Sequence, residues 1–277
     1  MSDHDRSSRG DAPLGVFDSG LGGLTVVRAL RQALPNERIV YLGDTARVPY
    51  GTRGPATVIK YALACARHLV GRNVKAIVIA CTTVSAVAPD RLRVELDIPI
   101  LGVIEPGARA GVRASLRGRI GVLATSATIA SGAYPRAVAA ESTRAEVIGQ
   151  AAPLLVPLAE EGWTDGEVPR LAARRYLEPL ARAQVDVVVL GCTHYPLLRG
   201  VIDSEARDLL GPSVGIVDSA VAVAEETREF LRTRGLHRAV EDGGSLELLV
   251  TDVPKTFELV ASRFLQMTLP DVQQIDL

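Results

Sequence analysis

The chain has 277 residues and a formal net charge of −1, from 31 basic and 32 acidic side chains. This balance provides no overall electrostatic attraction for nucleic acid or for an anionic membrane surface. Apolar residues make up 47% of the chain and charged residues 23%, which excludes extensive disorder, a collagen-like fibre and a coiled coil. A chain of this length predicts about two domains, and the composition favours a small molecule as the binding partner.

The beginning of the chain and the lengths of its apolar runs are used to predict the cellular location of the protein. Residues 1–12 are mostly polar and charged, and we expect them to form a flexible tail. They contain no apolar segment of the kind that directs export, so a cytoplasmic location is expected, with three free thiols. The longest apolar runs are far shorter than the ~20 residues needed to cross a bilayer, so no membrane span is expected.

Short β-branched runs alternate with longer amphipathic stretches, which is the pattern of an α/β protein. Runs such as AIVIA and DVVVL are apolar at nearly every position, as expected for parallel strands covered by helices on both faces. We therefore predict mostly parallel sheets. The expected strands are residues 14–17, 38–42, 74–80, 99–103, 119–124, 145–148, 185–190, 214–217 and 246–251.

Two of the amphipathic stretches are predicted to be helices. Apolar residues recur at helical spacing across 57–70, and Cys65 lies on that stripe, which indicates a packed core position. Residues 167–183 are also expected to be helical, although Pro179 should kink this helix or end it early.

Two segments of the chain resemble each other and suggest an internal repeat. The sequence VKAIVIACT contains Cys81, and VDVVVLGCT contains Cys192, so each is a buried type of strand followed by Cys and Thr. A weaker similarity relates LGVFDSG to IGVLATS, in which a strand again leads into a loop with a hydroxyl group. Two related α/β lobes are the simplest explanation.

The repeated cysteines are the leading candidates for chemistry. Ligands of open α/β sheets bind beyond the carboxyl ends of the strands, where both Cys81 and Cys192 are expected. A helix N-terminus behind each thiol would favour its thiolate, so both could act as bases or nucleophiles, although small cysteines also commonly fill a strand end. His194 could move a proton near neutral pH. Asp18 could orient such a group or simply cap a turn.

No cofactor signature is present. The glycine-rich segment DSGLGGLTV lacks the lysine of a Walker sequence and the spacing of a dinucleotide fingerprint. The cysteines and histidines do not have the spacing typical of a zinc site, and the few lysines have no context typical of pyridoxal phosphate. We expect neither a metal nor another cofactor.

Six segments in register carry a family resemblance: GVFDSGLGGLTV, YLGDTARVPYG, IACTTVSA, GVIEPG, ATIASGAY and LGCTHYPLL. Together they resemble the glutamate racemases of the aspartate/glutamate racemase superfamily, over about residues 14–252. The resemblance implies two pseudosymmetric α/β domains with the active site at their interface, and a homodimer. The first domain would be discontinuous, comprising residues 13–104 and 216–277, and the second would comprise residues 105–215.

The resemblance also implies cofactor-independent interconversion of L- and D-glutamate, which supplies D-glutamate for peptidoglycan. The thiol matching Cys81 would take the α-proton from D-glutamate, and the thiol matching Cys192 would take it from L-glutamate. Asp18 and His194 match the groups that assist them. Two bases suit this chemistry because inversion requires proton removal on one face of the carbon and delivery on the other.

Further positions match the substrate-binding residues of the family. They are Asp18, Ser19, Pro49, Tyr50, Gly51, Thr82, Thr83, Thr125, Thr128, Glu160, Thr193 and His194. Thr82 is a departure, because the family usually has asparagine directly after the first cysteine, and a threonine hydroxyl is shorter and has a single donor.

Three other interpretations remain open from the sequence. A related two-cysteine racemase would act on aspartate or on a hydantoin. A binding protein would use the same fold without turnover, for which Thr82 is the only sequence support. A Cys-His hydrolase would use Cys192 and His194, but it leaves Cys81 without a role.

Overall fold

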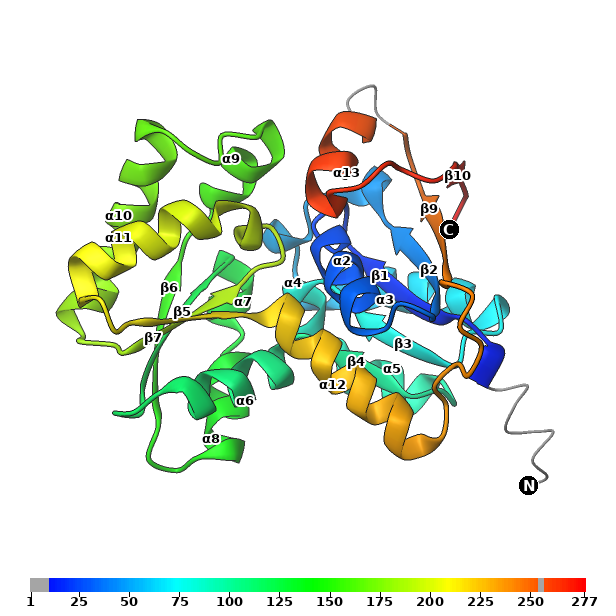
Figure 1. Cartoon of the computed structure of the whole chain (residues 1–277), viewed down its shortest axis with the longest axis horizontal. Helices are drawn as coiled ribbons and strands as arrows, with labels where there is room; N and C mark the ends of the chain where they lie inside the picture. Colours follow the sequence, from blue (N-terminus) through cyan, green and yellow to red (C-terminus); the bar gives the residue numbers. More distant parts are fainter. Residues whose placement is uncertain (1–9, 254–256) are drawn as a thin grey trace.

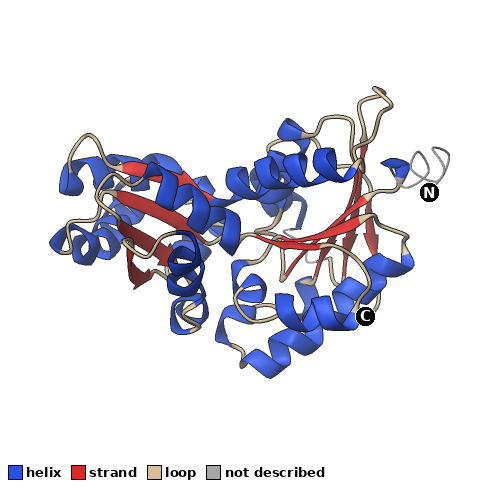
Figure 2. Ribbon diagram, turned by 90° about the horizontal axis from the view of Figure 1, so that it is seen from below, coloured by secondary structure: helices blue, strands red, loops and turns tan. Residues whose placement is uncertain are grey.

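The computed structural model describes residues 10–253 and 257–277. The strands form two separate sheets, and every strand pair among the described residues is parallel. Figure 1 shows the two sheets side by side, and Figure 2 shows helices on both faces of each. We call the six-stranded sheet and its helices the larger lobe, and the four-stranded sheet and its helices the smaller lobe. The predicted α/β class with mostly parallel sheets is confirmed.

The larger sheet has the strand order β10-β9-β2-β1-β3-β4, and the smaller sheet has the order β6-β5-β7-β8. The strands of the larger sheet are β1 (Leu14–Asp18), β2 (Arg38–Gly43), β3 (Ala76–Ile79), β4 (Ile100–Gly102), β9 (Ser245–Val250) and β10 (Val272–Gln274). Those of the smaller sheet are β5 (Arg119–Ala124), β6 (Glu146–Ala151), β7 (Val187–Gly191) and β8 (Gly215–Asp218).

The two strand orders reveal the internal repeat. The segment β2-β1-β3-β4 of the larger sheet has the same connectivity as β6-β5-β7-β8 of the smaller sheet. This relation pairs β1 with β5 and β3 with β7, the same pairs of segments that the sequence similarities connect. The loops after β3 and β7, which carry Cys81 and Cys192, therefore occupy equivalent places in the two lobes.

Helices cover both faces of both sheets, as the continuously apolar strands predict. Those that follow the larger-lobe strands are α2 (Leu24–Ala33), α3 (Pro55–Gly71), α4 (Thr82–Ser85), α5 (Pro89–Glu95) and α13 (Phe257–Leu265). Those of the smaller lobe are α6 (Ile104–Ala114), α7 (Ser126–Ala130), α8 (Ala133–Glu141), α9 (Leu155–Glu161), α10 (Glu167–Arg182) and α11 (Arg199–Leu210). Helix α12 (Ser219–Arg234) leads back from the smaller lobe and contacts α2 and α6. Short 3-10 turns occupy Thr45–Arg47, Tyr50–Thr52 and Tyr195–Leu198.

The apolar core is continuous between the lobes. One cluster of buried side chains extends from α2 and α13 of the larger lobe to α9, α10 and α11 of the smaller lobe. Two further clusters lie on the other faces, one between the larger sheet and α3 and one between the smaller sheet and α6 and α8. Burial of apolar surface thus stabilises each lobe and also the contact between them.

Several local predictions differ from the structure. The short edge strand β10 was not predicted, and α10 continues to Arg182 through Pro179. The expected boundary between residues 215 and 216 falls inside β8, which belongs wholly to the smaller sheet. Residues 1–9 of the predicted tail lie outside the described residues. Gly10 is buried, and its carbonyl accepts a hydrogen bond from Lys75 Nζ at 2.7 Å, so the end of that segment belongs to the fold.

Candidate active site between the two lobes

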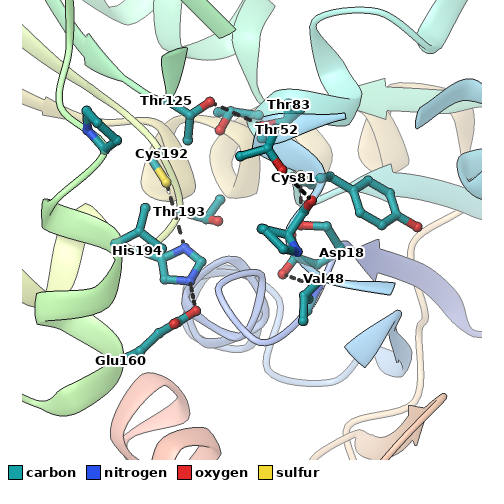
Figure 3. Close-up of a pocket in the computed structure, with 18 of the residues that line it drawn as sticks. Asp18, Val48, Thr52, Cys81, Thr83, Thr125, Glu160, Cys192, Thr193 and His194 are labelled. Atoms are coloured by element: carbon teal, nitrogen blue, oxygen red, sulfur yellow. Dashed lines mark hydrogen bonds and ion pairs between the residues drawn. The ribbon is translucent and has the colours of Figure 1, made fainter. Parts of the chain in front are cut away.

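A cavity of about 380 Å³ opens between the lobes, at the carboxyl ends of both sheets. Figure 3 shows side chains from both lobes lining it. The lining residues that the sequence predicted are Asp18, Ser19, Pro49, Tyr50, Gly51, Cys81, Thr82, Thr83, Thr125, Glu160, Cys192, Thr193 and His194. Of the predicted set, Thr128 alone lies outside the lining.

Cys81 lies between β3 and the short helix α4, with 5% of its surface exposed. Its Sγ donates a hydrogen bond to Ser19 Oγ at 3.3 Å. Burial raises the pKa of the Cys81 thiol to about 12. The neighbouring Asp18 carboxylate adds to this increase, and the hydrogen bond with Ser19 partly opposes it. Cys81 therefore holds its proton near neutral pH and can act as an acid.

Cys192 belongs to a chain of three groups in the smaller lobe. Its Sγ lies 3.7 Å from His194 Nδ1, and His194 Nε2 lies 3.0 Å from a Glu160 carboxylate oxygen. Burial alone would lower the pKa of His194, but the hydrogen bonds with Cys192 and Glu160 outweigh it and raise the pKa to about 10. The imidazole is therefore protonated near neutral pH and places a positive charge beside the Cys192 sulfur.

Asp18 ends β1 and is held by the glycine-rich loop that follows. Its carboxylate accepts hydrogen bonds from the backbone N–H groups of Gly20 at 3.2 Å and Gly23 at 2.9 Å. Burial raises the pKa of Asp18, while the Gly23 hydrogen bond and the charge of His194 oppose this effect. A Cβ atom at Gly22 would lie 2.4 Å from His194 Cε1, so glycine at this position lets the loop meet the histidine of the opposite lobe.

Threonine hydroxyls connect the lobes along one side of the cavity. Thr83 Oγ1 of the larger lobe lies 3.3 Å from Thr125 Oγ1 of the smaller lobe. Thr125 Oγ1 in turn accepts a hydrogen bond from the Thr128 N–H at 3.3 Å and lies 2.9 Å from the Thr128 hydroxyl. Thr128 thus lies behind Thr125, whose hydroxyl caps α7 and is oriented by the N–H and hydroxyl groups of Thr128.

Tyr50 lines the cavity, but its hydroxyl is engaged elsewhere. It donates to the carboxylate of Asp44, a fully buried residue that also accepts hydrogen bonds from Arg47 Nε and Thr251 Oγ1, each at 2.9 Å. Asp44 thereby ties the loop that carries Pro49 to the end of β9. No role was predicted for Asp44 from the sequence, although its position directly after a buried strand was a usable signal.

Other lining residues were also missed. An apolar wall is formed by side chains before and within α9, and hydroxyls beside two of the predicted motifs add polar surface. These residues are Gly20, Leu21, Val48, Thr52, Ser126, Pro153, Val156 and Pro157. The apolar wall excludes water from part of the cavity, which strengthens the polar interactions inside it.

Among residues 10–253 and 257–277, no group of three or more His, Cys, Asp or Glu side chains is arranged to hold a metal ion. None of the helices in these ranges is long and apolar enough to cross a membrane.

Two thiols that reach one cavity from equivalent loops of related lobes, one protonated and one beside an imidazolium, are typical of enzymes that move a proton at a carbon centre. The family model for Asp/Glu/Hydantoin racemase matches residues 22–227, and the chain belongs to this family.

Known relatives match along nearly the whole chain. A glutamate racemase of Geobacter metallireducens is 49% identical over 264 residues, which cover 95% of this chain and 96% of the relative. The crystal structure of glutamate racemase from Francisella tularensis in complex with D-glutamate has a TM-score of 0.88 and 35% identity, covering 96% of this chain and 98% of the other. The Thermus thermophilus enzyme, in complex with beta-chloro-D-alanine, has a TM-score of 0.85 and 42% identity, covering 97% and 98%.

Proposed function

We propose that this protein is a glutamate racemase that interconverts L- and D-glutamate with Cys81 and Cys192 as the two bases. The observation that carries the proposal is the placement of the two thiols, each after the corresponding strand of its own lobe and both lining one cavity. The choice of glutamate is supported by the names of the full-length relatives.

In the proposed reaction from L-glutamate, one sulfur removes a proton and the other delivers one. The Cys192 thiolate takes the α-proton, and the electron pair of the broken C–H bond passes into the α-carboxylate. Cys81, whose thiol pKa is about 12, then gives its proton to the opposite face of the carbon and becomes a thiolate. The reverse reaction exchanges the two roles. Since both transfers use side chains of the chain itself, we propose no cofactor.

The intermediate carries additional negative charge on the α-carboxylate, and fixed donors stabilise such charge in an enclosed site. The hydroxyls of Thr83 and Thr125 and the backbone N–H groups at the start of α4 and α7 are available at the cavity. The imidazolium of His194 keeps a positive charge beside Cys192, where a proton must arrive and depart in each cycle. We propose that Asp18 assists Cys81 in the larger lobe as His194 assists Cys192 in the smaller lobe.

The proposal extends to the biological role, location, assembly and domain organisation of the protein. The product D-glutamate would supply peptidoglycan synthesis, the enzyme would work in the cytoplasm, and it would function as a homodimer. We also propose two domains: the first is formed by residues 13–104 together with the chain after β8, and the second by residues 105–218, because β8 pairs with β7 of the smaller sheet.

The test is an incubation of the purified protein with L-glutamate and no added cofactor, followed by circular dichroism. The expected result is decay of the signal to zero, because mirror-image products have equal free energies. A parallel incubation in deuterium oxide should place deuterium at Cα. Absence of both effects from neutral to alkaline pH would favour a binding protein. Faster racemisation of L-aspartate than of L-glutamate would favour aspartate as the substrate.

A further inference from the structure

Helix α13 reaches from the larger lobe to the His194–Glu160 pair of the smaller lobe. The Phe264 ring packs edge-on against the imidazole of His194, with ring centroids 5.1 Å apart and ring planes at 83°. At the preceding position, Arg263 Nη1 donates a hydrogen bond to the backbone carbonyl of Glu160. In Figure 3 the pale red ribbon of α13 passes below Glu160.

The Arg263 contact satisfies a particular group at the end of α9. The last carbonyls of a helix have no partner within the helix. The N–H groups of Gly162 and Trp163 bond to earlier carbonyls of α9, and Arg263 bonds to that of Glu160. A cation at this position also interacts favourably with the negative end of the helix dipole.

Gly162 gives the guanidinium room to reach this carbonyl. Its backbone is left-handed, with φ of 78°, and a Cβ atom built there would lie 2.4 Å from Arg263 Cζ. Position 162 therefore requires glycine for two reasons: the left-handed turn that ends α9, and the close approach of Arg263 on α13.

The backbone of Glu160 needs external support if its carboxylate is to remain on His194. The Glu160 side chain is 48% exposed, so water competes for its carboxylate, whereas the His194 side chain is 12% exposed. Helix α9 has seven residues, and helices this short depend on tertiary contacts rather than on their own hydrogen bonds. Whether the Glu160 carboxylate stays in contact with His194 therefore depends on how the end of α9 is fixed.

We propose that Arg263 is a positioning residue: by fixing the end of α9 it holds the Glu160 carboxylate on His194 and so maintains the imidazolium beside Cys192. This inference rests on the proposed function for its kinetic consequence, but not for its effect on the histidine. It makes α13 of the larger lobe a component of the proton-transfer apparatus of the smaller lobe.

The first readout is the titration of His194 by NMR, which does not require activity. The protein has four histidines, and the His194→Gln variant assigns the resonance. Arg263→Gln should lower the His194 pKa, because a displaced carboxylate stabilises the imidazolium less. Glu160→Gln should lower it further, and Arg263→Lys, which keeps the cation, should restore part of the effect. Glu258→Gln, which removes a charge from an exposed position of α13, is the matched control and should change nothing.

The second readout is a double-mutant cycle on activity. Arg263→Gln should lower kcat roughly tenfold, a factor that corresponds to about 1.4 kcal/mol, with a smaller effect on KM. In the Glu160→Gln background the same substitution should have almost no effect, because residues that act through one another are not additive. Melting temperatures of all variants show whether each is folded at the assay temperature.

The outcomes separate this inference from the proposed function. A His194 pKa that is unchanged in a folded Arg263→Gln variant overturns the positioning role, and so does an Arg263→Gln effect of equal size with and without the Glu160 carboxylate. If the wild-type protein did not racemise glutamate, the proposed function would fail, while the titration of His194 would still decide whether Arg263 positions Glu160. If Arg263→Gln does not fold, Arg263→Lys is measured in its place, and an unchanged His194 pKa in the Glu160→Gln variant refutes the inference.

Discussion

Replacing Asp18 with asparagine should lower the pKa of the Cys81 thiol. Burial is the larger cause that raises this pKa from 9.0 to about 12, and the Asp18 carboxylate is the second. Because the carboxylate accounts for the smaller part of the increase, its removal should lower the Cys81 pKa by about one unit, equivalent to roughly 1.4 kcal/mol. Asparagine has the same shape and can still accept the hydrogen bonds from Gly20 and Gly23.

The assay is the rate of alkylation of Cys81 by iodoacetamide as a function of pH, in a Cys192→Ser background. Only the thiolate reacts, so the midpoint of the rate profile reports the Cys81 pKa. Asp90→Asn, which removes a fully exposed carboxylate on α5, is the control and should leave the midpoint in place. A midpoint that stays the same or rises in the Asp18→Asn protein would refute the account of why Cys81 holds its proton.

Three other substitutions test neighbouring parts of the structure. Cys65→Ser should cost about 1–3 kcal/mol of unfolding free energy, measured by urea denaturation, because it places a hydroxyl in a fully buried apolar position, while kcat per folded molecule stays near wild type. Thr82→Asn should change kcat or KM by about tenfold, since a hydrogen bond to a charged group contributes roughly 1.5–3 kcal/mol, and unchanged kinetics would remove residue 82 from the binding surface. Asp44→Asn should raise KM more than it lowers kcat, because it weakens the bonds to Tyr50 and Thr251 that hold the loop, and equal effects on both constants would count against this role.

The strands and the two thiols could be predicted from the sequence because their signals are local. A continuous apolar run such as the one before Cys81 has few structural alternatives, and its repetition before Cys192 marks equivalent places in two lobes. The expected strand ranges agree with the structure to within a few residues. The short edge strand β10 has one apolar residue among three, and so it carries no such signal.

Contacts between distant segments could not be predicted in this way. Arg263 lies 103 residues from Glu160 in the chain, and nothing in the amino acids around either residue indicates the other. Gly22 is similar: the sequence shows a glycine-rich loop, but its reason, the approach of His194 from the opposite lobe, depends on how the lobes are joined. Asp44 lies inside a motif that was recognised, yet one of its bonding partners, Thr251, becomes its neighbour only when β2 and β9 pair.

The central claim is that two thiols serve opposite faces of one carbon, and α-proton exchange in deuterium oxide tests it most directly. Cys81→Ala and Cys192→Ala should each abolish racemisation. The Cys81→Ala protein should still exchange the α-proton of L-glutamate and not that of D-glutamate, and the Cys192→Ala protein should show the opposite preference. A single variant that loses exchange with both enantiomers, while the other variant retains both, would contradict the two-base account.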